Sequence, residues 1–249
     1  MIIYSLDMIF YFNSKRKNKM RVRKKKNGDV RFDACRELYI DFDKTEAEQA
    51  AKNANSDYKK LSLKEIFPGF DKFRVEIGCG KGTFITETAK RNPDTAFIAV
   101  ERVRDVAIFA SEKIMAEKLD NVKFICADAA LLPVLFEENA FETIYINFCD
   151  PWPKARHAKR RLTSEGYLLL FKRILCDDGK IEFKTDNAGL FEFSLEEFPK
   201  AGFDMKNITR DLHASEFAKE NIQTEYERNF SAKGFKINRL EAYKNNSRD

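Results

Sequence analysis

Short apolar segments alternate with amphipathic ones through most of the chain, and this alternation limits the possible folds more than any other feature. The run 96–100 is apolar throughout, as a strand buried on both faces should be. The segment after it repeats apolar residues with helical spacing, at Val103, Val106, Ala107, Ala110 and Ile114. Further strands are predicted at 73–77, 122–126, 143–148 and 180–184, and further helices at 83–91, at 164–175 and around 191–198. Strand–helix alternation of this kind predicts βαβ units, a parallel sheet and an α/β fold.

The two ends of the chain differ from this central part. Residues 1–27 are apolar and then basic, and we expect them to form a disordered N-terminal extension. We expect residues 28–249 to form a single domain. Within it, the segment 45–61 is rich in Glu, Ala and Lys and is predicted to be a helix, and 203–207 and 235–243 are predicted to be strands.

The distribution of charge argues against a protein that is basic over its whole surface. The net charge of +5 depends on nine basic residues at 15–26, without which 36 basic residues face 40 acidic ones. A nucleic-acid site would therefore have to be a local patch. The five cysteines are scattered and form no CxxC pair, and the chain has only two histidines. This pattern favours a reducing cytoplasm over a disulfide framework or a structural zinc site. No uncharged apolar run approaches the ~18 residues that would indicate a membrane span.

A glycine-rich turn follows the first predicted strand, which ends at Glu76 and Ile77. Gly78 and Gly80 permit a tight turn and the close approach of a ligand to backbone N–H groups. The spacing is G-x-G-x-G, whereas dinucleotide-binding proteins have G-x-G-x-x-G. An acid two residues before the first glycine is a poor neighbour for a pyrophosphate and a good partner for an ammonium group.

Acidic residues follow the next two strands as well, at the edge where open parallel sheets bind ligands. Glu101 stands where a carboxylate accepts hydrogen bonds from ribose hydroxyls, and Asp128 stands where it can accept one from an adenine amine. Alone, Glu101 also fits a solvated acid at a helix N-terminus, and Asp128 a helix N-cap. Together with Glu76, and without a phosphate-binding basic residue, they favour a nucleoside with a cationic tail, such as S-adenosylmethionine.

A stiff loop with a basic run behind it follows the fourth predicted strand. Residues 150–154 read Asp-Pro-Trp-Pro-Lys and include the only tryptophan of the chain. A carboxylate and a flat ring on a rigid loop are suited to holding a planar base, although a structural turn with Trp152 in the core is the alternative. The eight residues 154–161 hold five Lys or Arg and one His. In a body that is otherwise net acidic, this run predicts contact with a nucleic-acid backbone.

These motifs, with two further segments, resemble the tRNA (guanine-N7-)-methyltransferase family of bacteria. The similarity follows the chain in order from about residue 21 to residue 243, and rests on the segments 76–82, 150–154, 156–161, 185–186 and 224–227. The glycine motif is shared by many methyltransferases, whereas the proline loop followed by the basic run is much more specific. The first nineteen residues have no counterpart in this pattern.

The resemblance implies a Rossmann-like class I methyltransferase fold, with a seven-stranded and mostly parallel sheet, the last strand antiparallel, and helices on both faces. The implied reaction is methyl transfer from S-adenosylmethionine to N7 of a guanine at position 46, in the variable loop of tRNA. The family pattern implies no metal, no membrane and no obligate protein partner, and it covers both monomers and homodimers.

Each matched position takes its expected role from this resemblance. The donor-binding positions fall on Glu76, Gly78, Gly80, Glu101, Asp128 and Asp150, and Asp150 is also the expected catalytic residue. The substrate-binding positions fall on Lys154, Asp186, Thr224, Glu225, Tyr226 and Glu227. The RNA-contacting stretch falls on Arg156, His157, Ala158, Lys159, Arg160 and Arg161.

Three other functions fit parts of the pattern less well. A methyltransferase that acts on an exocyclic amine would usually carry Pro-Pro-aromatic after the loop acid, where this chain has Pro-Trp-Pro. A non-catalytic tRNA-binding protein would have no use for acids at three successive strand ends. A nicotinamide-dependent oxidoreductase would share Glu101 but not the glycine spacing.

Overall fold

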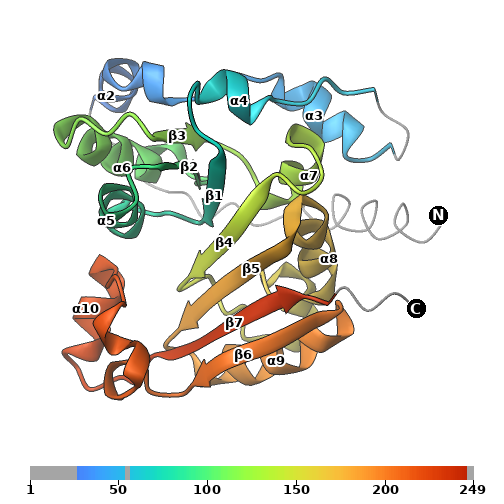
Figure 1. The fold of residues 1–249 in the computed structure, drawn as a ribbon, viewed down its shortest axis with the longest axis vertical. Helices are drawn as coiled ribbons and strands as arrows, with labels where there is room; N and C mark the ends of the chain where they lie inside the picture. The colour runs from blue at the N-terminus through green and yellow to red at the C-terminus, as the bar shows by residue number, and fades with distance from the viewer. Residues whose placement is uncertain (1–26, 54–56, 246–249) are drawn as a thin grey trace.

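The computed structural model describes residues 27–53 and 57–245, and the strands of this part of the chain form one seven-stranded sheet. The strand order is β3-β2-β1-β4-β5-β7-β6 (Figure 1). The strands are β1 (Lys72–Ile77), β2 (Thr95–Val100), β3 (Val122–Ile125), β4 (Phe141–Asn147), β5 (Leu175–Thr185), β6 (Phe203–Thr209) and β7 (Asn238–Lys244). β1 to β5 are parallel, and β7 lies antiparallel between β5 and β6. The expected sheet with its last strand reversed is confirmed.

Helices connect the strands, and most of the crossover helices lie where the periodicity predicts them. The longer helices are α5 (Thr83–Arg91), α6 (Arg104–Ala116), α8 (Glu165–Ile174) and α9 (Ala188–Lys200). The shorter ones are α2 (Gly28–Ala34), α3 (Lys44–Ala50), α4 (Leu63–Ile66), α7 (Leu132–Leu135) and α10 (Glu225–Ser231). Short 3₁₀ segments are η1 (Arg36–Leu38), η2 (Ala129–Leu131), η3 (Ala155–Arg160), η4 (Leu212–Ala214) and η5 (Glu216–Lys219).

Two apolar cores lie on opposite faces of the sheet. β2 contributes to both, because alternate residues of a strand point to opposite faces: Phe97 belongs to the cluster formed with α5 and α6, and Ile98 to the cluster on the other face. All six residues of β2 are buried, as its wholly apolar sequence predicts. Packing between α5 and α6 is close, since a Cβ added to Gly82 would lie 2.5 Å from the Cβ of Ala110.

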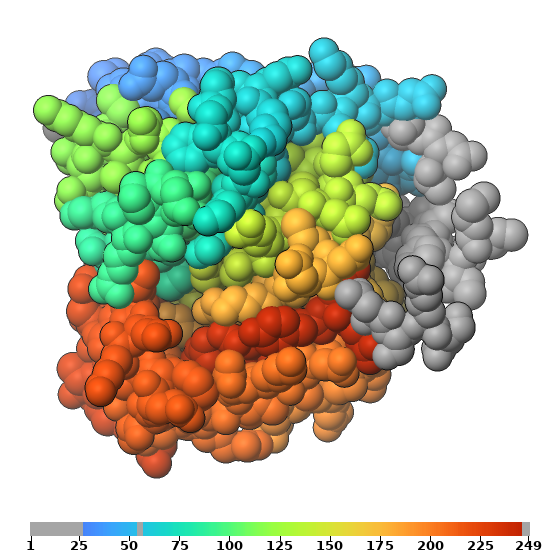
Figure 2. All heavy atoms as spheres, viewed as in Figure 1, coloured from blue at the N-terminus to red at the C-terminus, as the bar shows by residue number. Residues whose placement is uncertain are grey.

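The half of the sheet that contains β5, β7 and β6 has one face that no described helix covers. α8 and α9 lie behind β5 and β7 in Figure 1, and Figure 2 shows β4, β5 and β7 reaching the surface between the teal and green residues and the orange ones. Its side chains are charged and paired: Lys180 Nζ lies 2.8 Å from Glu182 Oε1 and 2.9 Å from Glu241 Oε1. Burial alone would raise the pKa of Glu241. Hydrogen bonds from Lys180 and Tyr243 outweigh this effect and lower the pKa to about 2.

One sequence-based element prediction is wrong. The helix predicted at 45–61 ends at Ala50, and the backbone N–H of Leu61 instead donates to the carbonyl of Leu135, so that tertiary contact overrides helix propensity here. The strand predicted at about 235–243 is confirmed as β7, which begins three residues later, at Asn238. The N-terminal extension predicted at 1–27 lies, except for Asn27, outside the described residues.

Candidate active site

The predicted strand-end residues meet at one edge of the sheet. Because β1 to β5 are parallel, their carboxyl ends lie together, and this edge carries Glu76 in β1 and Glu101 directly after β2. Asp128 follows β3, and Asp186 follows β5. In Figure 1, α10 lies beside the arrowheads of β4 and β5, at this same edge.

The glycine turn after β1 leaves its outer side open. Gly78 and Gly80 have φ angles of +77° and +55°, in the left-handed region where a side chain is strained. The backbone N–H of Gly78 donates to the carbonyl of Val100, which fixes the turn against β2. A Cβ added to Gly78 would meet no atom within 4 Å, so the backbone here is accessible to a ligand.

Glu76 is buried with one carboxylate oxygen unpaired. The residue is 2 % exposed, and its Oε1 accepts a hydrogen bond from Asn147 Nδ2 at 3.1 Å, while Oε2 has no partner among the described residues. Burial raises the pKa of Glu76 to about 7, against the opposing effects of the Asn147 hydrogen bond and the charge of Lys184. A buried acid with a free acceptor atom, two residues before an open turn, is suited to receiving a cationic group.

Glu101 and Asp128 organise the loops around this position. Glu101 accepts hydrogen bonds from the backbone N–H groups of Gly80, at 3.3 Å, and Val103, at 2.8 Å. Asp128 caps η2 by accepting from the N–H of Ala130 at 3.1 Å, so the N-cap alternative is correct for this residue. The same oxygen accepts from the hydroxyl of Tyr167 at 3.2 Å. Neither arrangement prevents further hydrogen bonds, because a carboxylate has about four lone-pair sites.

The loop after β4 is held by Arg161. Its Nε donates to the carbonyl of Pro151 at 3.0 Å, and its second guanidinium nitrogen donates to the carbonyl of Trp152 at 3.1 Å. The guanidinium of Arg160 lies 5.1 Å from the centre of the Trp152 ring, so this ring is not a bare platform for a base. Asp150 is exposed at the start of the loop, beside the end of β4.

The basic stretch forms η3 beside this loop. Lys154 is the N-cap of η3, and both Lys154 and Arg156 are exposed. The ring of His157 lies edge-on to Trp152, with 5.6 Å between the ring centres. Desolvation and then the charges of the neighbouring basic residues lower the pKa of His157. Ala158 accepts the backbone N–H of Arg161, and Lys159 is exposed. The outer residues Lys154, Arg156 and Lys159 are therefore exposed, whereas Arg161 is engaged with its own loop.

The segment 224–227 forms the beginning of α10, which the sequence did not predict as a helix. Thr224 is its N-cap and accepts the backbone N–H of Glu227 at 2.8 Å. Glu225 reaches Lys81 of the glycine turn at 2.9 Å. The Tyr226 hydroxyl donates to Asp186 at 3.3 Å, which joins two of the predicted substrate positions.

Glu227 has a different environment from its three neighbours. It is fully buried and forms an ion pair with Lys184 of β5 at 3.1 Å. Sequence reasoning missed Lys184, because nothing in a single lysine before Thr185 indicates a partner more than forty residues later in the chain.

The described residues hold no group of three or more His, Cys, Asp or Glu arranged to bind a metal ion. None of the described helices is long and apolar enough to cross a membrane.

Comparison with solved structures shows the fold. The chain is similar to an antibiotic-related methyltransferase, with a TM-score of 0.55 and 23% identity, over 74% of this chain and 94% of that one. It is also similar to the 16S rRNA methyltransferase KamB, with a TM-score of 0.58 and 13% identity, over 75% of this chain and 94% of that one. The sheet order and the glycine turn therefore define a class I methyltransferase fold.

Comparison with sequences shows the family. The model of a family described as putative methyltransferases matches residues 71–240. The tRNA (guanine-N(7)-)-methyltransferase of Brevibacillus brevis is 46% identical over 185 residues, 74% of this chain and 86% of that protein. The enzyme of the same name from Macrococcus caseolyticus is 46% identical over 184 residues, 74% of this chain and 87% of that protein. The chain belongs to the tRNA (guanine-N(7)-)-methyltransferase family.

Proposed function

We propose that this protein transfers the methyl group of S-adenosylmethionine to N7 of a guanine in tRNA, at position 46 of the variable loop. The observation that carries the proposal is the buried Glu76 carboxylate, which has an unpaired oxygen and stands two residues before an open glycine turn, with Glu101 and Asp128 at the neighbouring strand ends. The donor set fits a nucleoside with an ammonium group. We infer a cytoplasmic location and either a monomer or a homodimer.

The acids and the turn would hold the donor. Glu76 would face its ammonium group directly or through water, Glu101 its ribose hydroxyls and Asp128 its adenine amine, and Gly78 and Gly80 let the backbone approach it. When bound, the donor supplies an electrophilic methyl group on a positively charged sulfur.

The protein then has to align the acceptor and stabilise charge. Guanine N7 carries a free lone pair at neutral pH, so the chain needs no general base, and most of its contribution is orientation. Positive charge moves to the purine during transfer, and the exposed Asp150 carboxylate stabilises it there. Asp150 and Asp186 also have the acceptor atoms to bind the N1–H and N2–H₂ edge of guanine, which adenine lacks.

The test is to incubate the protein with labelled donor and tRNA that lacks modifications, digest the tRNA and identify the labelled nucleoside. The proposal predicts 7-methylguanosine. Label in an N6-methyladenosine fraction would support the exocyclic-amine alternative, and no label, with intact tRNA binding, would support the non-catalytic one.

Donor affinity is expected to depend on pH through Glu76. Its pKa is about 7 without donor, and the donor's ammonium group favours the ionised form, so the affinity should rise with pH and level off above pH 7. Below that pKa the affinity should fall by up to about tenfold per pH unit. Calorimetric titration with the donor between about pH 5.5 and 7 measures this slope, below the pKa of about 7.7–8.0 expected for the donor's α-amino group.

Glu76→Gln is the matched control for this pH dependence. It keeps the hydrogen bond to Asn147 but cannot ionise, so its donor affinity should be low and independent of pH. An unchanged slope in a folded Glu76→Gln protein would show that another group titrates.

The exposed basic residues of η3 are expected to bind phosphates without sequence preference. Replacing Arg156 by alanine should weaken tRNA binding and make the plot of log affinity against log salt shallower by about 0.7–0.9, the change expected for one phosphate that is no longer neutralised. Donor affinity should not change. Filter binding at several salt concentrations measures this slope, and an unchanged slope for Arg156→Ala would exclude Arg156 as a phosphate-binding residue.

The variant Arg161→Ala should instead lower the methylation rate at saturating tRNA, because it releases the loop carbonyls of Pro151 and Trp152.

A further inference from the structure

We propose that Lys184 and Glu227 form a buried positioning pair that holds Tyr226 in place for the tRNA base, so that Glu227 acts through Tyr226 and does not touch the substrate. This inference rests on the proposed function, because it takes the acceptor near Tyr226 to be a tRNA guanine. It assigns a role to Lys184 and changes the role expected for Glu227.

Glu227 has no atom left for a substrate. The residue is 0 % exposed. Its Oε2 accepts from Lys184 Nζ at 3.1 Å, and its Oε1 accepts from Asn221 Nδ2 at 2.6 Å and lies 3.0 Å from His213 Nε2. Because both oxygens point into the protein, the carboxylate acts on α10 and on the loop before it.

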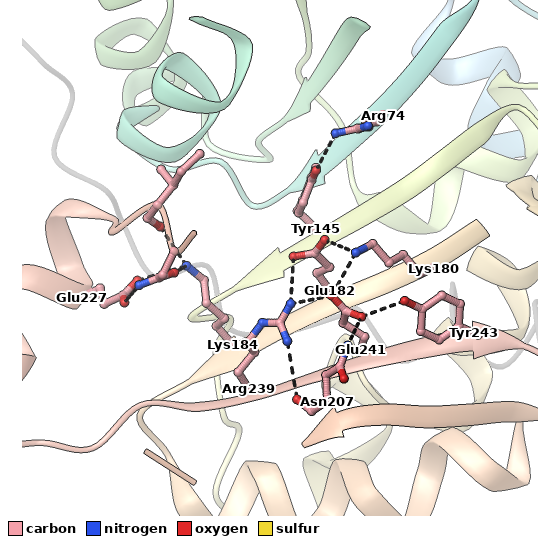
Figure 3. A network of polar contacts seen from close by, with 12 residues as sticks. Arg74, Tyr145, Lys180, Glu182, Lys184, Asn207, Glu227, Arg239, Glu241 and Tyr243 are labelled. Carbon is pink, nitrogen blue, oxygen red and sulfur yellow. Dashed lines mark hydrogen bonds and ion pairs between the residues drawn. The ribbon is translucent and has the colours of Figure 1, made fainter. Parts of the chain in front are cut away.

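Lys184 is the counterpart of Glu227 on the sheet. It is 6 % exposed and stands one residue before the end of β5. Besides Glu227, its ammonium group donates to Asn221 Oδ1 and to the carbonyl of Ile222, both at 2.9 Å. All three of its hydrogen bonds therefore go to the segment 221–227, and Figure 3 shows Lys184 reaching this segment from β5.

Tyr226 is the residue that this pair presents. It adjoins Glu227, yet it is 42 % exposed, and its hydroxyl donates to Asp186, two residues after Lys184. One side of its ring stacks on Phe230, with 4.1 Å between centres and 16° between planes. Phe148, at the end of β4, lies 5.2 Å away. An exposed aromatic ring backed by other rings is a surface on which a nucleobase stacks.

Single and double variants separate a positioning role from substrate contact. Lys184→Met and Glu227→Gln each leave one buried charge unpaired and should each lower kcat/KM for tRNA by about tenfold or more. The double variant Lys184→Met/Glu227→Gln removes both charges and should recover most of the lost kcat/KM. Rates are measured at saturating donor, because the charge of Lys184 also lowers the pKa of Glu76.

Lys180→Met is the matched control. Lys180 lies on the same face of β5, four residues earlier, and is paired with Glu182 and Glu241, but its hydrogen bonds do not reach α10 (Figure 3). Amide hydrogen exchange of residues 221–231 should be faster in both single variants, near wild type in the double variant and unchanged in Lys180→Met. Tyr226→Ala should lower kcat/KM by itself and should not add to the effect of Lys184→Met.

Several results would overturn the positioning role. A double variant as inactive as Glu227→Gln would mean that Glu227 touches the substrate, and normal kcat/KM in Lys184→Met would mean that the pair positions nothing. Full additivity of Tyr226→Ala with Lys184→Met would mean that the two act separately. If wild type itself fails to methylate tRNA, the proposed function is wrong, whereas an active wild type with any of these three results makes only this inference wrong.

Discussion

Replacing Asp150 by asparagine is expected to lower the single-turnover rate of methyl transfer about 100-fold, which corresponds to about 3 kcal/mol of transition-state stabilisation. Asp150 is exposed on the loop that follows β4, at the sheet edge where the proposed function places the donor methyl and the target base. Asparagine keeps the shape but removes the charge that favours the cationic product. Since this charge matters most as the reaction proceeds, the rate should fall more than either dissociation constant rises.

The measurement is single-turnover methylation at saturating donor and tRNA, with circular dichroism to confirm the fold. Asp178→Asn is a suitable control, because Asp178 is equally exposed but lies in the amino-terminal part of β5, away from the site. A near-normal rate in Asp150→Asn would mean that the carboxylate only positions ligands and that alignment alone carries the reaction.

Replacing Gly82 by alanine is expected to destabilise the protein by about 2–4 kcal/mol. Gly82 has a φ angle of +78°, and the new Cβ would lie 2.5 Å from Ala110 Cβ and 2.7 Å from Ala110 Cα. Because Ala110 is on α6 and Gly82 is the N-cap of α5, the two helices would have to separate. Urea denaturation of the two proteins measures the difference in the free energy of unfolding.

Gly78→Ala is the comparison that isolates the clash. Gly78 has nearly the same φ angle, +77°, but a Cβ there meets no atom within 4 Å. Its cost to stability should be limited to backbone strain of about 1–3 kcal/mol, whereas donor affinity should fall because the Cβ occupies the open side of the turn. Equal stability losses in the two variants would show that the close packing between α5 and α6 does not matter.

The parts of the fold that could be predicted from the sequence depend on short-range patterns. The wholly apolar run of β2 and the periodicity of α6 identify both elements, and parallel pairing then places Glu76, Glu101 and Asp128 at one edge. The prediction of a helix at 45–61 was wrong beyond Ala50, because only the composition of the segment supported it. At the end of that segment, the backbone N–H of Leu61 donates to the carbonyl of Leu135, seventy-four residues later, and such a long-range contact leaves no trace in composition.

The contacts that the site residues make were harder to predict than the positions of these residues in the fold. The basic run read as one phosphate-binding surface, but Arg161 folds back onto the loop and Arg160 lies against Trp152. The backbone at Trp152 lies in the left-handed region, with a φ angle of +40°, and such a turn has no sequence signal in a non-glycine residue. Similarly, Glu227 is buried because α10 packs beside the end of β5, and this packing cannot be predicted from the local sequence around Glu227.

The measurement that tests the central claim most directly uses two tRNA transcripts that differ at one atom. One carries guanosine at position 46 and the other carries 7-deazaguanosine, which has a C–H group in place of N7 and therefore no lone pair to methylate. Our account predicts that the protein binds both transcripts equally, converts the first to 7-methylguanosine and transfers no methyl group to the second. Equal methylation of the two transcripts would contradict it.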